Sequence, residues 1–365
     1  MDVPSLQTPL RVPRRIAVLG LGLAGCSLLR ALAFAKASFE LVAFESRPRA
    51  DWMQAQATVG VLHPFVSKDH NLASQISQYA LARSLQWLED LNAPGLGFAC
   101  LQGVRENGEM QPGGWANLTW FRQACLQHAQ ARLGERLSLH FSAQVTGVED
   151  LLAQGFDAVF VTTGHARLLP KALQLNLTPI SGQVSYFELD TIASAADRLR
   201  LESMLPDCVV CEEGTLTPLV NNSIYIGSSF HRGINQANVR PEDHQQNLAR
   251  LAQFKPELAQ ALTTYLGQAK AWTGVRHATR DRLLHLGLAV HPNHSLGRSV
   301  SRLEQLPRWQ GVYCLLGLGS RGLSTAPWAA ECLVKSILGE PLPEPARLLR
   351  AIDPARFVLR NHVRA

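Results

Sequence analysis

The sequence predicts an α/β protein with two interleaved domains, one of which is built to bind a dinucleotide. The first observation is the N-terminal segment RIAVLGLGLAGCSLLRAL, in which Gly20, Gly22 and Gly25 have the G-x-G-x-x-G spacing. A β-branched apolar run precedes these glycines and a helix-forming run follows them, as in a Rossmann-type unit. The second observation is that two later apolar runs, within 155–167 and 311–338, also lead into small-residue turns. Because the other segments do not repeat this order, we expect the second domain to contain a mixed sheet.

The strand that follows the first helix strengthens the dinucleotide prediction. It has the sequence FELVAFE and ends at Glu45, 20 residues beyond Gly25. In a Rossmann-type unit Gly20 permits the tight turn, Gly22 lets a pyrophosphate approach the backbone, and Gly25 lets the helix pack closely on the strand. The helix N-terminus offers free N–H groups to the phosphates. Glu45 can accept hydrogen bonds from a ribose hydroxyl and would repel a 2′-phosphate, so NADP is not expected.

Three turns of small residues are expected to meet at one place. Besides the glycine loop, these are Thr163–Gly164 and the stretch GLGSRGL at 317–323. The segment 136–149 is expected to form paired extended segments nearby. A long dinucleotide contacted at both ends suits this arrangement, and FAD fits it better than NAD. The residues expected to bind FAD are Gly20, Gly22, Leu23, Ala24, Gly25, Glu45, Val145, Thr163, Gly164, Gly317, Gly319, Ser320, Arg321, Gly322 and Leu323.

The composition is that of a globular protein with one large or two interleaved domains. Of the 365 residues, 46% are hydrophobic and 18% are charged, and no apolar run is long enough to span a bilayer. The N-terminal residues lack the order of a secretory signal. The seven cysteines are scattered, and the C-x-x-C match at 208–211 has no second pair. We therefore expect reduced thiols, a cytoplasmic location and no metal site.

The formal net charge of +6 leaves two interpretations open. One is an ordinary basic enzyme, and the other is a polyanionic partner such as RNA. Arginines gather near both ends of the chain, at positions 11–15 and again in 346–365, where five arginines stand against one aspartate. Charge alone does not decide between the two.

The order of motifs predicts how the two domains are divided along the chain. We expect residues 1–13 to form a flexible N-terminal tail and 346–365 a basic C-terminal segment. The FAD-binding domain is expected at 14–75, 120–180 and 270–345, and the substrate domain at 80–118 and 182–270.

Several longer strings resemble those of a known family. They include GVLHPFVSKDHN (60–71), PGGWANLTWFRQACLQHA (112–129), IGSSFHRG (226–233), GVRHATRDRLLHLG (274–287) and LGLGSRGLSTAPWAAE (316–331). These strings are similar to the D-amino-acid-oxidase-like FAD oxidoreductases, which include glycine oxidase and sarcosine oxidase. More narrowly, the chain resembles the FAD-dependent oxidoreductase domain of the bifunctional tRNA-modifying MnmC family, over roughly 14–360.

The resemblance implies a reaction on a modified wobble uridine of tRNA. The enzyme would oxidatively remove the carboxymethyl part of a 5-carboxymethylaminomethyl group, leaving a 5-aminomethyl group and releasing glyoxylate. The family often carries an N-terminal methyltransferase domain. This chain begins without one, so we expect that activity in a separate protein partner or not at all.

The resemblance also implies which side chains act on the substrate. Arg276 matches the carboxylate-binding arginine of the oxidases, although a structural ion pair with Asp281 is the alternative. Lys68 could contact flavin or substrate, or be an ordinary solvated lysine. His231 could help to deprotonate the substrate amine, or simply be hydrogen-bonded at a strand end.

Two other functions compete with the tRNA-modifying flavoenzyme. One is a small-molecule amine oxidase that acts on glycine or sarcosine and releases peroxide. The other is a flavin-binding module without catalytic activity inside an RNA-binding assembly.

Overall fold

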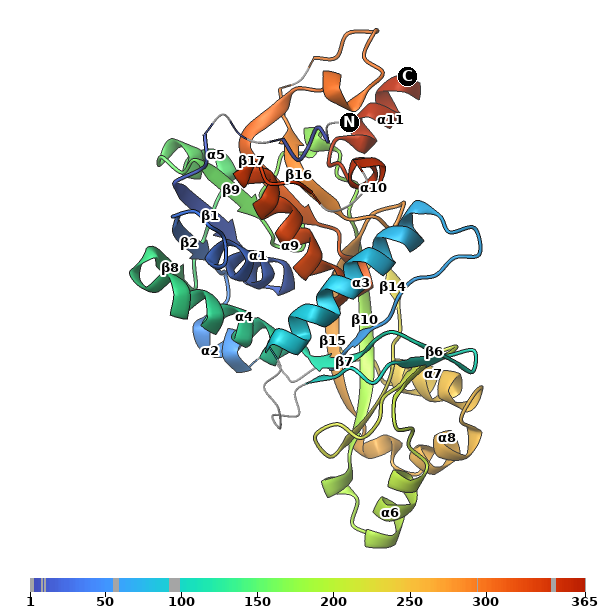
Figure 1. The fold of residues 1–365 in the computed structure, drawn as a ribbon. Coiled ribbons are helices and arrows are strands. Elements are labelled where there is room, and N and C mark those ends of the chain that lie inside the picture. Colours follow the sequence, from blue (N-terminus) through green and yellow to red (C-terminus); the bar gives the residue numbers. More distant parts are fainter. Residues whose placement is uncertain are drawn as a thin grey trace.

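The computed structural model describes residues 3–7, 9, 11–54, 59–91, 99–293, 295–342 and 346–364. The α/β fold predicted from the sequence is confirmed. A six-stranded, largely parallel sheet forms one half of the molecule and an eight-stranded mixed sheet forms the other (Figure 1). In the part of the chain that is described, no helix is long and apolar enough to cross a membrane.

The six-stranded sheet brings the predicted turns to one edge. Its strands are β1 (Arg15–Leu19), β2 (Glu40–Phe44), β8 (Leu137–His140), β9 (Ala158–Val161), β16 (His285–Val290) and β17 (Arg308–Leu316). The order is β16-β17-β9-β1-β2-β8, and all neighbours are parallel except β16, which is antiparallel to β17. The carboxyl ends of the five parallel strands therefore share one edge, which is where open α/β sheets bind their ligands.

Strand β1 is buried on both faces, as its unbroken apolar sequence predicts. Ile16 and Val18 belong to one hydrophobic cluster, and Ala17 and Leu19 to another. The first cluster lies under the helices drawn in front of the sheet in Figure 1. The helices around this sheet are α1 (Leu23–Ala33), α3 (Leu72–Leu91), α4 (Leu118–Leu133) and α9 (Gly322–Leu338) on that face and α5 (Val148–Ala153) on the other.

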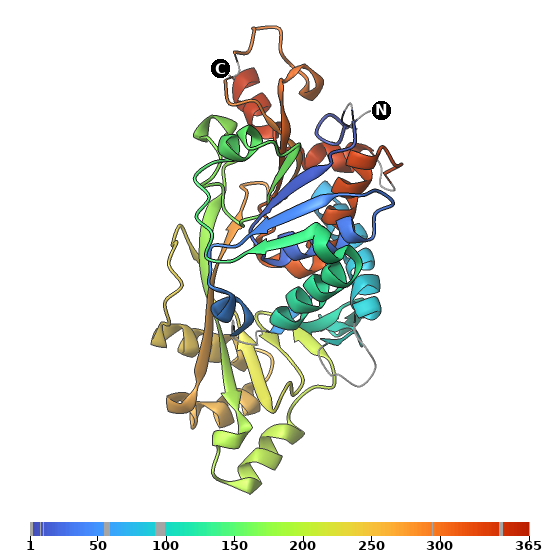
Figure 2. The ribbon, with the colours of Figure 1, turned by 90° about the vertical axis from the view of Figure 1, so that its left-hand side faces the viewer.

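The mixed sheet is organised around one long strand. Its strands are β5 (Val104–Glu106), β6 (Glu109–Gln111), β10 (Thr178–Glu188), β11 (Val209–Cys211), β12 (Thr215–Leu216), β13 (Ser223–Gly227), β14 (His231–Arg232) and β15 (Lys270–Ala278). Strand β10 pairs antiparallel with β13, β14 and β15. Figure 2 shows β10 and β15 side by side along the length of the molecule.

Two helices cover the outer face of the mixed sheet. They are α7 (Pro241–Ala252) and α8 (Pro256–Thr263), and each begins with proline at its first position, where a missing N–H costs nothing. Their apolar side chains form a separate cluster with those of β10 and β13. A third helix, α6 (Ala195–Ser203), lies at the far end of this half (Figure 1).

A three-stranded sheet joins the two halves. It consists of β3 (Val59–Leu62), β4 (Ala99–Cys100) and β7 (Gly114–Asn117), in the order β3-β7-β4. Helix α4 starts directly after β7, and the Asn117 side chain caps it by accepting a hydrogen bond of 3.0 Å from the Trp120 N–H. The short helix α2 (Arg49–Gln54) precedes β3.

Two segments differ from the sequence-based expectations. Residues 136–149 form only one strand, β8, and α5 begins at Val148, so the expected paired extended segments are not formed. The expected flexible tail is wrong for its described part: Val3, Ser5 and Leu6 are buried, and the Ser5 carbonyl accepts a 2.7 Å hydrogen bond from the Leu288 N–H. The tail packs there because β16 is an edge strand with an unpaired side.

The predicted division into two domains stays a prediction, but two segments bear on its boundaries. Strand β15 lies entirely in the mixed sheet, although 270–278 falls in the range assigned to the FAD-binding domain. Helix α3 packs in the same cluster as α1 and α9, although much of it falls in the range assigned to the substrate domain.

The basic C-terminal segment is helical and packs on the parallel sheet. It contains α10 (Ala346–Ala351) and α11 (Arg356–Arg364). Arg356 is buried and donates hydrogen bonds to both carboxylate oxygens of Asp281, at 2.9 and 3.0 Å. Burial alone would raise the pKa of Asp281, but the hydrogen bonds and charge of Arg356 lower it to about 2.

Candidate active site

The glycine loop is held against the neighbouring strand end by backbone packing. A Cβ atom at position 25 would lie 1.9 Å from the Gly20 carbonyl oxygen, so only glycine lets the start of α1 approach β1 so closely. Gly20 itself has φ +94°. The Thr162 hydroxyl lies 2.8 Å from the Leu19 carbonyl oxygen and 2.9 Å from that of Gly20, which ties the loop to the end of β9.

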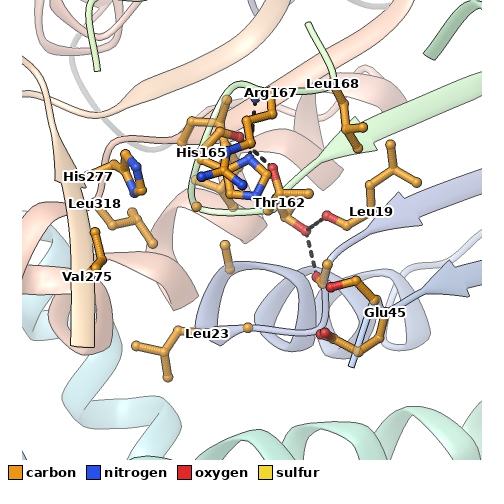
Figure 3. Close-up of a pocket in the computed structure, with 18 of the residues that line it drawn as sticks. Leu19, Leu23, Glu45, Thr162, His165, Arg167, Leu168, Val275, His277 and Leu318 are labelled. Carbon is orange, nitrogen blue, oxygen red and sulfur yellow. Dashed lines mark hydrogen bonds between the residues drawn. The ribbon is translucent and has the colours of Figure 1, made fainter. Parts of the chain in front are cut away.

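A cavity of about 720 Å³ lies at the carboxyl edge of the parallel sheet, where the three small-residue turns meet. We call it the nucleotide cavity; Figure 3 shows part of its lining. Helix α1 begins at this cavity with Gly22 as its N-cap, and no side chain caps it. Its first N–H groups are therefore available to an anion. The predicted residues that line the cavity are Gly20, Gly22, Leu23, Ala24, Glu45, Val145, Thr163, Gly164, Gly317, Gly319 and Gly322.

Glu45 is buried at one end of the nucleotide cavity, and Arg47 holds its carboxylate in place. The Arg47 backbone N–H and Nε lie 3.0 and 2.9 Å from Oε1, and the Leu21 N–H donates to Oε2 at 3.0 Å. Burial alone would raise the pKa of Glu45, but these hydrogen bonds and the charge of Arg47 lower it. Glu45 therefore faces the cavity as a fixed carboxylate. Arg47, two residues further along, was missed by the sequence analysis.

Two histidines face the same cavity at its other end. His165 follows the Thr163–Gly164 turn and His277 comes from β15, and their ring centroids lie 6.1 Å apart (Figure 3). Burial and the charge of Arg167 lower the pKa of both rings, so both are neutral at neutral pH. Neither histidine was predicted from the sequence. His277 reaches this edge only through the pairing of β15 with β10.

A second cavity of about 390 Å³ adjoins the first and opens between the two halves of the molecule. We call it the substrate cavity. Its lining includes the turn that starts α9 and residues of β3, β13 and β15. The residues that line both cavities, and therefore mark their junction, are Leu23, Val275, Arg276, Gly319 and Gly322. The three predicted residues Ser320, Arg321 and Leu323 line the substrate cavity instead of the nucleotide cavity.

Two glycines paired in register lie beneath the side chains of Arg276 and Trp272. Gly182 of β10 is paired with Gly274 of β15. A Cβ atom at 182 would lie 2.5 Å from Arg276 Nη2, and one at 274 would lie 2.5 Å from the indole of Trp272. The side chains of Arg276 and Trp272 therefore lie across positions that a side chain would otherwise fill. Gly182 was not singled out from the sequence, because its role depends on the register of β10 and β15.

Arg276 and Arg321 are two cavity cations without acidic partners among the described residues. The Arg276 guanidinium carbon lies 4.5 Å from the centroid of the Phe230 ring, and that of Arg321 lies 4.9 Å from the centroid of Phe65. Within the described ranges, neither guanidinium forms an ion pair. Burial lowers the pKa of both, yet an arginine stays charged at neutral pH. Two partly desolvated cations aimed at one cavity are suited to bind an anion.

The comparisons with known proteins agree with this geometry. The family described as "FAD dependent oxidoreductase" (DAO) matches residues 112–336, which is more than half of the chain. The chain belongs to this family. The FAD cofactor and the oxidoreductase class predicted from the sequence are thereby confirmed.

The curated relatives are longer than this chain. A protein of Azoarcus sp. (strain BH72) named "tRNA 5-methylaminomethyl-2-thiouridine biosynthesis bifunctional protein MnmC" is 29% identical over 405 residues, a match that covers 96% of this chain and 61% of the relative. A protein of the same name from Aeromonas hydrophila is 32% identical over 269 residues, which cover 68% of this chain and 38% of the relative. The chain thus spans less than two thirds of the length of these relatives.

Solved structures share the fold. Glycine oxidase from Geobacillus kaustophilus aligns with a TM-score of 0.65 and 16% identity, over 94% of this chain and 99% of the oxidase. Iminodiacetate oxidase from Chelativorans sp. BNC1 aligns with a TM-score of 0.66 and 16% identity, over 93% of this chain and 99% of that one.

The residues of the nucleotide cavity fit FAD. A Cβ atom at Gly22 would meet no atom within 4 Å, so the space in front of the uncapped helix is open to a pyrophosphate, whereas Gly25 is closely packed behind the loop. Glu45 offers a fixed carboxylate to a ribose hydroxyl. The FAD-binding roles of the individual residues stay predictions.

The three side chains predicted to act on the substrate occupy different surroundings. Arg276 lines the substrate cavity, and the Asp281 carboxylate that was its alternative partner is instead bound by Arg356 and Arg360. Lys68 lies in an exposed turn after β3 and lines neither cavity. His231 also lines neither; its Nε2 lies 2.8 Å from the buried carboxylate of Asp243 at the start of α7. The structure therefore brings only Arg276 of the three to the cavity.

A different histidine lines the substrate cavity. His63 follows β3, and its Nε2 lies 3.2 Å from a carboxylate oxygen of Glu106. Burial lowers the pKa of His63, the Arg321 charge acts in the same direction, and Glu106 opposes both. The sequence analysis assigned no role to His63, because its carboxylate neighbour lies 43 residues further along the chain, on another strand.

Proposed function

We propose that this protein oxidatively removes the carboxymethyl group from 5-carboxymethylaminomethyl-(2-thio)uridine at the wobble position of tRNA. The products are 5-aminomethyl-(2-thio)uridine and glyoxylate. The proposal rests on the family, on the names of the curated relatives and on the chemistry of the substrate cavity.

The single observation that carries the proposal is Arg276 at the junction of the two cavities. It is partly desolvated, it has no acidic partner in the described part of the chain, and it stands beside the cavity that fits FAD. A planar guanidinium binds a carboxylate through two parallel hydrogen bonds. Arg276 would thus hold the carboxylate of an N-substituted glycine and turn its methylene carbon toward the nucleotide cavity. Arg321, which lines the same cavity, supplies a second positive charge.

The proposed reaction balances with water and one oxidant. Bound FAD would supply the two-electron oxidation that converts the C–N bond next to the substrate methylene carbon to C=N, with dioxygen as the final electron acceptor. Water then adds to the imine carbon and the C–N bond breaks. The two carbons leave as glyoxylate, and the nitrogen stays on the uridine as the aminomethyl group.

His63 is the side chain that we assign to proton transfer in this site. A secondary amine is protonated near neutral pH and must lose a proton before its lone pair can assist the oxidation. His63 lines the substrate cavity and is held neutral by burial, so it can accept that proton, and Glu106 can stabilise the charge that results. His231, bonded to Asp243 outside the cavity lining, is better suited to a structural role.

The partners of the reaction follow from the same proposal. The substrate is tRNA, and a separate methyltransferase would act on the 5-aminomethyl product. The names of the relatives support the tRNA substrate, because they refer to tRNA 5-methylaminomethyl-2-thiouridine biosynthesis.

The alternative is a glycine- or sarcosine-type amine oxidase that produces peroxide. The observation in its favour is that the fold is shared with glycine oxidase along almost the whole chain. The two functions use the same cavity chemistry and differ in the size of the group attached to the amine.

Incubation of the yellow holoprotein with tRNA from a strain arrested at the carboxymethylaminomethyl stage tests the proposal. We expect that nucleoside to disappear, the 5-aminomethyl nucleoside to appear in equal amount, and one glyoxylate to be released per nucleoside converted. An unchanged nucleoside profile, together with peroxide formation from free glycine or sarcosine, would establish the alternative instead.

A further inference from the structure

Phe230 is an exposed aromatic side chain in the lining of the substrate cavity. Half of its surface, 51%, is accessible to solvent, and its ring lies over the guanidinium of Arg276. Single exposed hydrophobic residues are common on protein surfaces and require no explanation. Phe230 differs because its position is fixed on both sides and because it stands next to the arginine that would bind the substrate carboxylate.

The residues on either side of Phe230 are anchored to the same buried carboxylate. The Ser229 hydroxyl donates a 2.7 Å hydrogen bond to Asp243, and His231 Nε2 lies 2.8 Å from the other oxygen of that side chain. The Ser229 hydroxyl also accepts a 3.0 Å hydrogen bond from the Gln183 N–H. Asp243 is almost fully buried. The Ser-Phe-His segment therefore presents the aromatic ring at the cavity in a set position, which lowers the entropy cost of binding against it.

The chemistry of such a ring suits a nucleobase. Every base has a flat π face, and stacking on aromatic side chains is a general means of binding single-stranded RNA. Glycine and sarcosine have no group that could stack. The exposed Arg232 follows two residues later on the same sheet face as Arg276, because both are paired with Ile180. A positive charge is thus available on the surface beside the ring for a nucleotide phosphate.

The dimensions of the substrate agree with this placement. Four bonds separate the uracil ring from the carboxylate carbon of a carboxymethylaminomethyl group, a span of roughly 5 Å when extended. The guanidinium carbon of Arg276 lies 4.5 Å from the centroid of the Phe230 ring. A carboxylate on Arg276 therefore leaves the uracil ring within reach of Phe230.

We propose that Phe230 is the platform on which the modified uracil stacks, and that it makes the enzyme specific for an RNA-linked amine over a free amino acid. The inference rests on the proposed function and adds a specificity-determining residue to it. Ser229, His231 and Asp243 act as positioning residues that hold the platform.

The test compares Phe230→Leu with Phe230→Trp in the holoprotein. Leucine keeps an apolar side chain beside Arg276 but has no π face, whereas tryptophan keeps a π face. The first measurement is the dissociation constant for an anticodon stem-loop RNA that carries the product, 5-aminomethyluridine, followed by fluorescence anisotropy. We expect Phe230→Leu to weaken this binding roughly 10- to 100-fold and Phe230→Trp to stay close to the wild type.

The second measurement is the flavin absorbance change on addition of iminodiacetate, an N-substituted glycine without a base. Because Phe230 also contacts the Arg276 guanidinium, we expect Phe230→Leu to weaken iminodiacetate binding slightly but several-fold less than RNA binding, since a ligand without a π face gains nothing from stacking. Unchanged RNA affinity in Phe230→Leu would overturn the inference. So would an equal loss for RNA and iminodiacetate, because Phe230 would then act through Arg276. A wild-type protein that releases no glyoxylate from RNA rejects the proposed function itself, which is a separate outcome.

Discussion

The two cavities differ in how their charged groups are paired. In the nucleotide cavity the carboxylate of Glu45 already has hydrogen bonds from Leu21 and Arg47. In the substrate cavity Arg276 and Arg321 rest on phenylalanine rings and, among the described residues, have no acidic partner. We propose that the first cavity is preformed for the cofactor. In the second, we propose that the two arginines are left without a carboxylate so that they can bind the substrate anion.

A second arginine, Arg356, differs from Arg276 because it has a carboxylate partner. Arg356 is buried in the FAD-binding half and forms two hydrogen bonds with Asp281. It is a structural arginine of the kind that the sequence analysis considered for Arg276. This difference is the reason why we propose a functional role for Arg276 and a structural one for Arg356.

The largest effect is expected from removing the free guanidinium. Arg276→Ala should keep FAD and the yellow colour but lose about 2–5 kcal/mol of transition-state stabilisation, because a charged partner of the substrate is truncated. Steady-state kcat/KM for the modified RNA measures this. Arg276→Lys is the matched control. It keeps the positive charge but lacks the planar guanidinium that forms two parallel hydrogen bonds with a carboxylate, so it should recover only part of the loss. Full activity in Arg276→Ala would remove Arg276 from the mechanism.

In the nucleotide cavity, the close packing of the glycine loop should make Gly25 sensitive to substitution. Gly25→Ala places a Cβ 1.9 Å from a backbone oxygen and should cost about 1–3 kcal/mol of stability, with a matching loss of FAD retention. Thermal unfolding and flavin content after purification measure the two effects. Gly22→Ala is the control, since its Cβ meets no protein atom: it should unfold like the wild type and lose only FAD affinity. Equal stability of all three proteins would contradict the packing described for Gly25.

A smaller effect is expected at Gly182, beneath Arg276. Gly182→Ala puts a methyl group 2.5 Å from both Arg276 Nη2 and the Ser229 carbonyl oxygen, so the guanidinium and the backbone at 229 must both shift. We expect kcat/KM to fall roughly tenfold, equivalent to about 1.4 kcal/mol, with flavin content unchanged. In the double variant Gly182→Ala, Arg276→Ala only the clash with the Ser229 carbonyl remains, so the two losses should be less than additive. Additive losses would show that Gly182 acts independently of Arg276.

The sequence predicted one cavity better than the other for a physical reason. The G-x-G-x-x-G loop and Glu45 belong to one continuous strand–turn–helix–strand unit, so spacing alone placed them. Gly182 and Phe230 acquire their roles from the register of β10 with β14 and β15, which joins segments far apart in the chain. No local pattern encodes that register.

The histidines illustrate the same limit. His231 stands in a string typical of the family, yet in the fold it anchors a loop to Asp243. His63 lines the substrate cavity through the pairing of β3 with β7, and its neighbour Glu106 comes from the mixed sheet. A sequence shows which titratable residues exist, but the tertiary structure decides which of them meet a ligand.

A separate prediction concerns the pH dependence of stability at the structural arginine, away from both cavities. His285 Nε2 donates to the Leu175 carbonyl at 2.7 Å, so its Nδ1 accepts from Arg356. Burial and the Arg356 charge lower the pKa of His285 to about 3. The His285 ring of the unfolded chain takes up a proton below about pH 6.5, whereas that of the folded chain does so only near pH 3. The free energy of unfolding should therefore decrease as the pH is lowered from about 6.5 to about 3, by up to about 1.4 kcal/mol per pH unit.

Urea unfolding of the wild type and of His285→Asn across this range measures the effect. The variant has no titrating group at 285, so its stability should fall less steeply between pH 6.5 and pH 4. Parallel pH profiles for the two proteins would contradict a neutral, buried His285.

Anaerobic single-turnover mixing tests the central claim most directly. The holoprotein is mixed with an anticodon stem-loop that carries 5-carboxymethylaminomethyluridine, and the flavin absorbance and glyoxylate are followed together. We predict that the wild type bleaches fully with one glyoxylate per flavin, and that Arg276→Ala, although equally yellow, bleaches far more slowly. A wild-type protein that keeps its colour in the presence of this RNA, but bleaches with glycine or sarcosine, would contradict the account.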